Sequence, residues 1–363
     1  MKRIFTIIIS YFSFLIGFAQ MYVWQNGILV GDYAAKEVDS VKFYRPQLQT
    51  DTLRQEPTIG AINVQFSVSE GSSVFFSQGN LRYNPSTKEW AFASAQTSRI
   101  GENNSSISAD YAGWIDLFGW GTSGYNNVMP HISVQDYTKY ANVHSIAETN
   151  YDWGVYNKIS NGGNEAGLWR TLTADEWMYL FFSRPNADSL FGFAVVNNVK
   201  GLILLPDNWQ QPEGVDFYPS TTRGLWPEGK YFWNMASDNY EHNTYSKEQW
   251  VMMETAGAVF LPAAGYRKGT EVEEFNEYGA YWTSSGRDDD FAYRCIFYSS
   301  MLSPGGSNIT YYYGYSVRLV QDAIKVIPSE NEKYVYGEMY VYKSNAEIDR
   351  YFVNQVDSIT YRK

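Results

Sequence analysis

An α+β domain framed by two short β repeats is the fold that the sequence predicts, and three observations carry this prediction. Apolar and mixed side chains alternate along residues 291–298 and 311–320, which is typical of strands. A segment that starts at Thr173 has the spacing and the capping residues of a helix. Finally, residues 21–45 and 339–363 align without gaps at an offset of 318 and share seven identities, which indicates an internal repeat.

The first nineteen residues predict a secretion signal. Lys2 and Arg3 precede an almost wholly apolar run, and Gly17 and Ala19 supply the small residues that a signal peptidase recognises. The apolar run is too short for a comfortable membrane span, so we do not expect a membrane-spanning protein. We expect a mature chain that begins at Gln20 and is secreted across the inner membrane, to the periplasm, the cell surface or the medium. No Cys lies near the cut, so a lipoprotein is not expected.

The two terminal β-hairpin repeats, residues 20–45 and 339–363, each predict a strand, a polar turn and a second strand that begins near Val-Asp-Ser. Such a unit cannot bury a core alone, because chains below about 40 residues usually need a staple or a partner. Three arrangements stay open: the copies pack on each other, each docks on the central domain, or each extends another protein's sheet. Docking or mutual pairing is favoured, because exposed hairpin edges promote aggregation.

The central domain is predicted to cover residues 59–322, between polar linkers at 46–58 and 323–338. Its clearest helix begins at Thr173, which forms a capping box with Glu176, and Pro185 ends it at or just before Arg184. A second helix is predicted over 246–255, and 257–267 predict a buried strand that leads into a turn. The domain closes with the strands 291–298 and 311–320, separated by a turn rich in Gly, Pro and Ser.

Composition limits the classes of partner. The net charge of −11 disfavours nucleic acid and anionic lipid, because both are bound through an excess of Lys and Arg. Aromatic residues make up 18% of the chain, and Tyr is the most frequent of them. Tyr suits half-buried strands and wet binding surfaces equally well. Cys295, the single cysteine, cannot form an internal disulfide, and its place on an apolar strand face predicts a small buried side chain.

A family resemblance appears at residues 169–184, WRTLTADEWMYLFFSR. This segment resembles the R-L-P-T-x-x-E-W-x-Y segment of the formylglycine-generating, sulfatase-modifying family, with Thr171 and Leu172 where Leu and Pro are usual. LPAAGYR at 261–267, AYWTSS at 280–285 and GYSVRLVQD at 314–322 extend the resemblance to the Fibrobacter succinogenes major paralogous domain, a secreted relative. The resemblance implies a C-type-lectin-like fold with a twisted, mostly antiparallel sheet and one or two helices. Formylglycine generation uses a pair of cysteines, and this chain has one, so no enzymatic activity is predicted.

Candidate ligand-binding residues come from segments that should converge at one end of the sheet. They are Trp282, Arg267, Asp288, Asp290, Arg294 and Tyr312. Aromatic planes beside Arg donors suit sugars or peptides. Asp288, Asp289 and Asp290 are also candidate ligands for Ca²⁺, which prefers carboxylate oxygens, and a solvated acidic rim is the alternative. No other cofactor is expected.

These observations predict a secreted, non-enzymatic recognition protein that binds a glycan or a protein at the cell surface. Two alternatives stay open. One is a structural or assembly subunit of a surface complex, joined through the terminal repeats. The other is an extracellular enzyme of unrecognised type that acts on polysaccharide, for which paired carboxylates would be needed.

Overall fold

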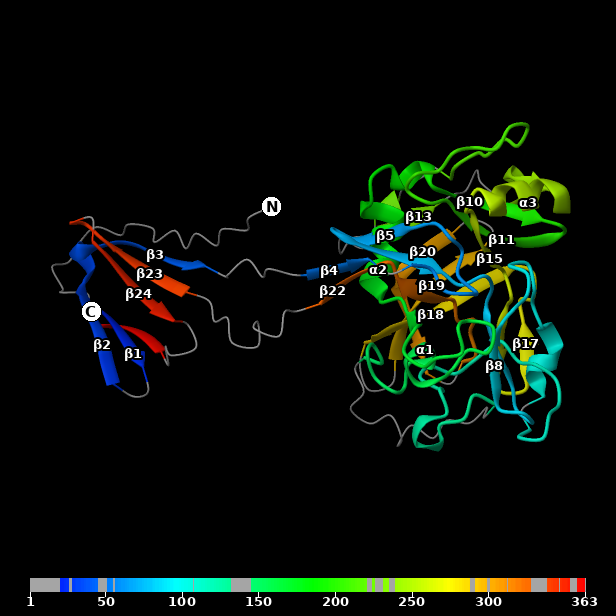
Figure 1. Cartoon of the computed structure of the whole chain (residues 1–363), viewed down its shortest axis with the longest axis horizontal. Helices are drawn as coiled ribbons and strands as arrows, with labels where there is room; N and C mark the ends of the chain where they lie inside the picture. The colour runs from blue at the N-terminus through cyan, green and yellow to red at the C-terminus, as the bar shows by residue number, and fades with distance from the viewer. Residues whose placement is uncertain are drawn as a thin grey trace. The chain divides into compact units, whose positions relative to one another are not determined.

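The computed structural model contains two compact units, Arg54–Lys325 and a smaller terminal unit that both ends of the chain build together (Figure 1). Strands predominate and helices are few, which confirms the α+β class. The described residues are 20–25, 28–44, 51–54, 56–106, 108–131, 145–220, 224–225, 231–234, 239–287, 291–298, 301–311, 313–327, 338–345, 347–352 and 358–362. The predicted leader, residues 1–19, lies outside them.

The widest sheet of the larger unit has the order β12-β13-β20-β19-β18, and its strands are antiparallel. These strands are Gly224–Leu225 (β12), Tyr231–Asn234 (β13), Met301–Thr310 (β20), Phe291–Tyr298 (β19) and Tyr278–Gly286 (β18). This sheet carries the candidate site described below.

Two four-stranded sheets accompany it. One has the order β14-β10-β11-β15, in which β10 and β14 are parallel and the other pairs antiparallel. Its strands are Thr244–Tyr245, Phe191–Val196, Val199–Leu204 and Val259–Pro262. The other is antiparallel, with the order β5-β6-β21-β9. Its strands are Phe66–Ser69, Ser72–Phe76, Leu319–Asp322 and Arg170–Thr171.

Three two-stranded ladders and several short helices are the remaining described elements outside the terminal repeats. The ladders pair Leu81–Asn84 (β7) with Glu89–Phe92 (β8), Tyr266–Lys268 (β16) with Glu271–Glu273 (β17), and Asp51–Arg54 (β4) with Ile324–Ile327 (β22). The last ladder lies within the two predicted linkers, so these linkers are not wholly irregular. The α-helices are Trp153–Tyr156 (α1), Ala174–Met178 (α2) and Lys247–Thr255 (α3). Short 3-10 turns are Gly101–Ser105, Tyr125–Asn127, Ala187–Ser189 and Tyr240–His242.

Both predicted helices are present, and each begins with a complete capping box. The Thr173 hydroxyl accepts from the Glu176 amide at 3.1 Å, and the Glu176 carboxylate accepts from the Thr173 amide at 2.8 Å. Helix α2 continues as a π turn, Tyr179–Ser183, and the backbone becomes extended at Arg184, before Pro185, as predicted. Ser246 and Gln249 form the corresponding capping box of α3.

One predicted strand is corrected. The partner of β19 is β20, Met301–Thr310, and not the predicted strand 311–320. The segment 301–310 holds Pro304, Gly305 and Gly306, which indicate a turn, but the β19–β20 register shifts between Arg294 and Ile296, so these residues lie in a bulge. Gly305 is required there, because a Cβ atom would lie 2.5 Å from the carbonyl oxygen of Ala174 in α2.

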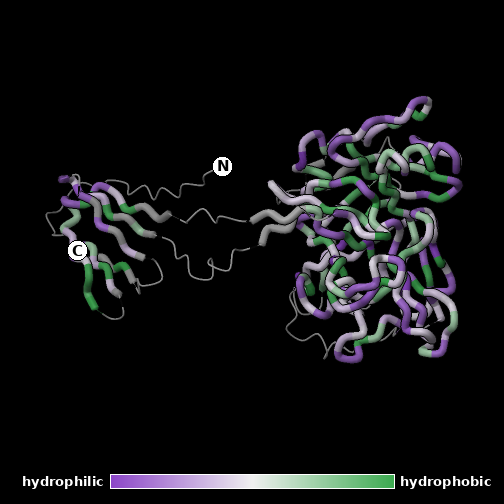
Figure 2. Tube along the Cα trace, viewed as in Figure 1, coloured by the Kyte–Doolittle hydropathy of each residue, from purple (hydrophilic) through white to green (hydrophobic). Residues whose placement is uncertain are grey.

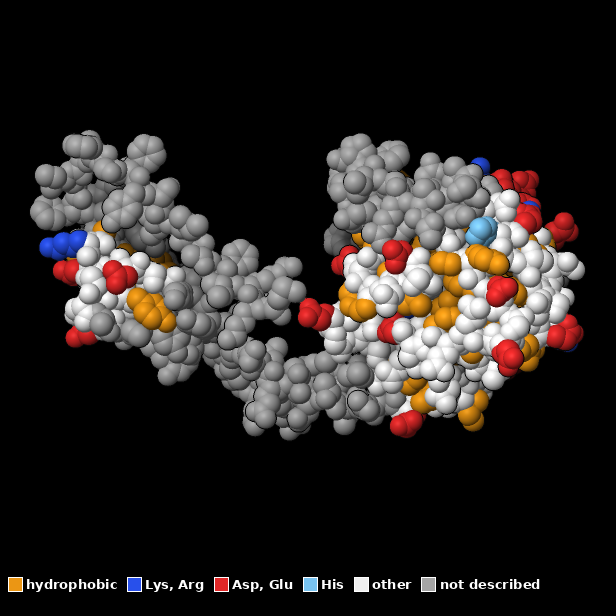
Figure 3. Space-filling model, turned by 90° about the horizontal axis from the view of Figure 1, so that it is seen from above, with side chains coloured by type: hydrophobic (Ala, Val, Ile, Leu, Met, Phe, Trp, Pro, Cys, Tyr) orange, Lys and Arg blue, Asp and Glu red, His pale blue; other side chains and the backbone are white. Residues whose placement is uncertain are grey.

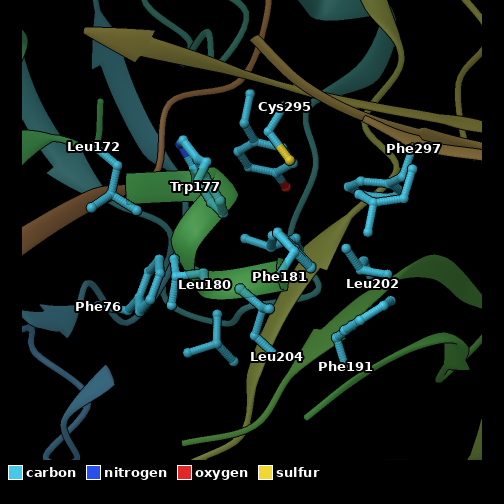
Figure 4. Close-up of a cluster of buried hydrophobic side chains, with 14 of the residues drawn as sticks. Phe76, Leu172, Trp177, Leu180, Phe181, Phe191, Leu202, Leu204, Cys295 and Phe297 are labelled. Atoms are coloured by element: carbon cyan, nitrogen blue, oxygen red, sulfur yellow. The ribbon is translucent and has the colours of Figure 1, made fainter. Parts of the chain in front are cut away.

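The core of the larger unit is rich in aromatic side chains. Figure 2 shows hydrophobic segments running through its interior. Helix α2 and the π turn after it pack Trp177 and Phe181 into one cluster, where the ring centroids are 6.3 Å apart and the rings are stacked (Figure 4). Cys295 is fully buried in the same cluster, as predicted, and burial raises the pKa of its thiol far above the ordinary value. A thiol held protonated in this way is a poor nucleophile.

The terminal unit consists of two three-stranded sheets that exchange strands. The N-terminal copy supplies Gln20–Gln25 (β1), Ile28–Ala34 (β2) and Val38–Tyr44 (β3), with a 3-10 turn at Ala35–Glu37. The C-terminal copy supplies Glu338–Lys343 (β23), Ile348–Phe352 (β24) and Ser358–Arg362 (β25). The sheet orders are β2-β1-β25 and β24-β23-β3, so each copy gives its third strand to the hairpin of the other. Of the three arrangements left open by the sequence, the copies therefore pair with each other.

The strand exchange follows the repeat symmetry residue by residue. Gln20 pairs with Arg362 and, 318 positions on, Glu338 pairs with Tyr44. The buried side chains correspond in the same way, because Met21 and Val23 of one copy match Met339 and Val341 of the other. The hydroxyls of Tyr33 and Tyr351, also equivalent residues, hydrogen-bond to each other, and the Tyr33 hydroxyl also donates to Asp349 Oδ2 at 2.7 Å.

Candidate ligand-binding groove

A groove of about 610 Å³ opens on the face of the widest sheet. Its lining comes from β16, from the segment between β17 and β18, from β18 to β20, and from the segment that follows β20. The lining residues are Tyr266, Glu274, Glu277, Tyr278, Arg294, Ile296, Tyr298, Met301, Ile309, Tyr313 and Tyr315. A volume of this size is typical of small-molecule sites in proteins.

The strand period places β19 side chains in the groove. Arg294, Ile296 and Tyr298 are two residues apart, so all three lie on one face of the strand. Tyr278 of β18 pairs with Tyr298 across the ladder, and their rings stack with centroids 5.6 Å apart. This pair forms a continuous aromatic wall.

Arg294 lies between aromatic rings. Its guanidinium carbon is 4.9 Å from the ring centroid of Tyr315 and 6.0 Å from that of Tyr278, and its Nη1 donates to the Tyr315 hydroxyl. These contacts hold the side chain in one orientation. The Arg294 Nε–H is buried and has no hydrogen-bond partner among the described residues.

The remaining tyrosines form the rest of the aromatic wall. The rings of Tyr313 and Tyr315 are almost parallel, with centroids 6.1 Å apart, and Tyr266 lies 5.9 Å from Tyr313. The Tyr266 hydroxyl donates to Glu273 Oε2 at 2.6 Å, and this bond, with burial, raises the pKa of Tyr266. Burial also raises the pKa values of Tyr278 and Tyr315. These hydroxyls therefore stay protonated and neutral at physiological pH.

Two carboxylates balance the guanidinium. Glu274 and Glu277 come from the tight turn between β17 and β18, where Glu274 has a positive φ of 53°. Gly265 allows this turn to approach, because it has a φ of 72° and a Cβ atom there would lie 2.3 Å from the Glu273 carbonyl oxygen. Lys200 Nζ contacts Glu277 Oε1 at 2.5 Å. The groove thus offers charged donors and acceptors side by side, without an excess of positive charge.

Two of the predicted binding residues belong to the core, which is a correction. Trp282 is 1% exposed, and its indole Nε1–H donates to the Phe118 carbonyl at 2.6 Å. Arg267 is also 1% exposed and donates to backbone carbonyls, including that of Gly269 at 3.1 Å. Burial lowers the pKa of Arg267 to about 10. The segment after β20 lies against both residues, because Arg267 bridges to Gly314 and the ring of Tyr315 lies 4.8 Å from that of Trp282, so neither offers a ligand-facing surface.

Of the other predicted site residues, Arg294 lines the groove, whereas Tyr312, Asp288, Asp289 and Asp290 lie outside the described residues. Within the described part of the chain, no group of three or more His, Cys, Asp or Glu side chains could hold a metal ion. Figure 3 shows Asp and Glu side chains at several separate places on the visible face of the larger unit. No helix in the described ranges is long and apolar enough to cross a membrane.

Sequence reasoning missed Tyr266, Tyr278 and Tyr298 as site residues. The high Tyr content of these segments was visible, but tyrosine also has a high strand propensity, so the signal was ambiguous. The useful signal is the period-two spacing of Arg294, Ile296 and Tyr298, which selects one face of β19.

No family model, no curated protein and no solved structure matches the chain.

Proposed function

We propose that the protein is a secreted, non-enzymatic recognition protein whose larger unit has a C-type-lectin-like fold and binds a neutral glycan at the cell surface. The observation that carries this proposal is the groove, in which tyrosine rings surround an oriented guanidinium beside two carboxylates. The fold assignment is supported by the motif segments that carry the family resemblance. Two of them contribute β9 and β21, which pair with each other.

The chemistry of the groove fits a sugar. A pyranose ring has C–H groups on its faces, which are attracted to the negative face of an aromatic ring. Its hydroxyls can both donate and accept, so they can pair with Arg294 and with the carboxylates of Glu274 and Glu277. Anionic sugars are disfavoured, because Glu274 offsets the charge of the guanidinium and Glu277 already pairs with Lys200. A neutral glycan therefore satisfies more of the groove than a phosphate or an acidic peptide does.

The proposal of a non-enzymatic role rests on the cysteine content. Formylglycine generation needs a pair of cysteines, whereas this chain has only Cys295, which is fully buried. Formylglycine generation is therefore not proposed for this protein.

The test is a glycan array on the purified chain, followed by calorimetry with the best neutral oligosaccharide. Arg294→Met removes the donors and keeps an unbranched apolar stem, and Tyr313→Ala removes one ring. We expect each to weaken binding about tenfold or more, which corresponds to about 1.4 kcal/mol. The control is Tyr218→Ala, because Tyr218 is 53% exposed and does not line the groove.

Two results would contradict the proposal. One is the absence of binding to any glycan on the array, in the presence or absence of Ca²⁺. The other is binding that the two groove variants and the Tyr218 control affect equally. Circular dichroism of each variant establishes that any loss does not come from unfolding.

A further inference from the structure

The two repeat copies differ at one pair of equivalent positions beside their junction. Gly31 of β2 and Asp349 of β24 are 318 residues apart, so they occupy the same place in the two copies. Tyr33 and Tyr351, two residues further along each strand, are identical and hydrogen-bond to each other. Residues two apart on a strand lie on one face. The junction is therefore symmetric in its tyrosines and asymmetric in the residues beside them.

Gly31 leaves space for the hydroxyl of the tyrosine from the other copy. A Cβ atom at position 31 would lie 2.6 Å from the Tyr351 hydroxyl oxygen and 2.7 Å from the Tyr33 ring. Both distances are too short for a carbon contact, so a larger residue would displace the hydrogen-bonded tyrosine pair. Gly31 and its ladder partner Val23 are both buried, so this displacement would also disturb the small core of the terminal unit.

Asp349 supplies a charged acceptor at the equivalent position. Its Oδ2 accepts from the Tyr33 hydroxyl at 2.7 Å and contacts Lys343 Nζ at 3.3 Å. Hydrogen bonds to a carboxylate are stronger than those between neutral groups. The N-terminal copy has Gly31 in place of Asp349, so it offers no such acceptor to a tyrosine. It also has Gln25 in place of Lys343, so the cation that contacts the carboxylate is absent as well.

We propose that Gly31 and Asp349 are specificity-determining residues, through which each repeat copy pairs with the unlike copy in preference to a like one. Two C-terminal copies would place an Asp where Gly31 lies, so its Cβ would meet the opposing hydroxyl and two carboxylates would compete for the tyrosines. Two N-terminal copies would have Gly at both positions, so neither tyrosine would have a charged acceptor. The unlike pair alone combines space on one side with an acceptor on the other. This recognition depends on no property of the groove.

Variants of the full chain reproduce each like pair within one molecule. Gly31→Asp places Asp at both positions, and Asp349→Gly places Gly at both. The double variant exchanges the two residues between the copies, so its composition and net charge equal those of the unmodified chain. Hydrogen exchange with mass spectrometry follows residues 20–44 and 338–362. The larger unit is the internal reference in every sample.

The expected exchange rates rank the variants. Gly31→Asp should raise the rates of the terminal unit about a hundredfold or more, because overpacking and like charges act together. Asp349→Gly should raise them about tenfold, since the Tyr33 hydroxyl loses its charged acceptor. The double variant should return to within about threefold of the unmodified chain, because the Tyr351 hydroxyl then gains the acceptor that the Tyr33 hydroxyl loses.

Gly31→Ala separates the effect of space from that of charge. It adds the Cβ atom alone and should raise the exchange rates less than Gly31→Asp does. Unchanged exchange in Gly31→Asp would overturn the proposal, because the junction would then tolerate a like pair. So would a double variant in which the two single effects add, because positions 31 and 349 would then act as separate structural sites and not as a pair.

Discussion

The larger unit and the terminal unit obtain their cores from different parts of the chain. In the larger unit, five tryptophans are at most 1% exposed, and every core residue lies between positions 54 and 325; the five are Trp120, Trp153, Trp169, Trp177 and Trp282. In the described part of the terminal unit, the core has five buried hydrophobic side chains, and they come from both ends of the chain. One copy alone cannot bury enough apolar surface to offset its conformational entropy. The larger unit therefore draws its stability from one continuous stretch of chain. The terminal unit is stable only when the N-terminal and C-terminal copies of the repeat are both present.

Deletion of residues 338–363 is the strongest test of this comparison. It removes two strands of one sheet and one strand of the other, so β3 loses its partner and only the hairpin of β1 and β2 is left. We expect residues 20–44 to lose all slow hydrogen exchange while the larger unit keeps its own. Hydrogen exchange with mass spectrometry measures both units in one sample.

The control for this deletion is addition of a synthetic peptide of residues 338–363. The peptide should restore protection of residues 20–44, because it supplies the missing strands. Protection that survives the deletion without the peptide would show that one copy folds alone.

Trp177→Ala tests the independence of the larger unit. Trp177 is 1% exposed and packs against Phe76, Phe181 and Tyr281. Its truncation should lower the free energy of unfolding of this unit by about 3–5 kcal/mol. Urea unfolding measures the change, and exchange protection of the terminal unit should stay the same. Val251→Ala, on the exposed face of α3, is the control and should change stability by less than about 0.5 kcal/mol.

Tyr33→Phe tests the junction of the two copies. The variant loses the hydrogen bonds from the hydroxyl to Asp349 and Tyr351, so the polar atoms of both partners lose a bond. We expect the terminal unit to be destabilised by about 1–2 kcal/mol, seen as faster hydrogen exchange in β2 and β24, the two strands that these bonds join. Tyr22→Phe is the matched control, because its hydroxyl donates to Gln20 of the same strand and not to the other copy in the described part of the chain. If Tyr33→Phe and Tyr22→Phe increased hydrogen exchange equally, the hydrogen bonds between the two copies would add no more stability than a bond within one strand.

Thr173→Ala and Ser246→Ala give the smallest expected effect. Each removes the capping hydroxyl of a helix in the larger unit and should cost about 1 kcal/mol. The Thr173 variant should cost more, because Glu176 of that capping box also binds Arg170, at 2.7 Å, and so links the helix start to β9. Urea unfolding of the two variants measures the difference. If Ser246→Ala lowered the free energy of unfolding more than Thr173→Ala did, the ion pair between Arg170 and Glu176 would add no stability to the capping box.

Local sequence patterns determined the features that depend on neighbours in the chain. The capping boxes at Thr173 and Ser246 involve residues three positions apart, and both are present. The repeat at offset 318 indicated that the two ends share one strand pattern, because an identical pattern dictates an identical buried face. The pattern itself is corrected, because each copy has three strands and not the two predicted. The burial of Cys295 followed in the same way from the alternation along its strand.

Tertiary contacts decided the rest. Met301–Thr310 is a strand because β19 pairs with it and a bulge accommodates Pro304, although its composition indicates a turn. Trp282 and Arg267 are buried because the segment after β20 covers them, and the groove consists of tyrosines from segments that are separate in the chain. Sequence alone could not choose among three arrangements of the repeats. The choice depends on pairing between residues more than 300 positions apart, whose free energy is a property of the folded chain and not of any local pattern.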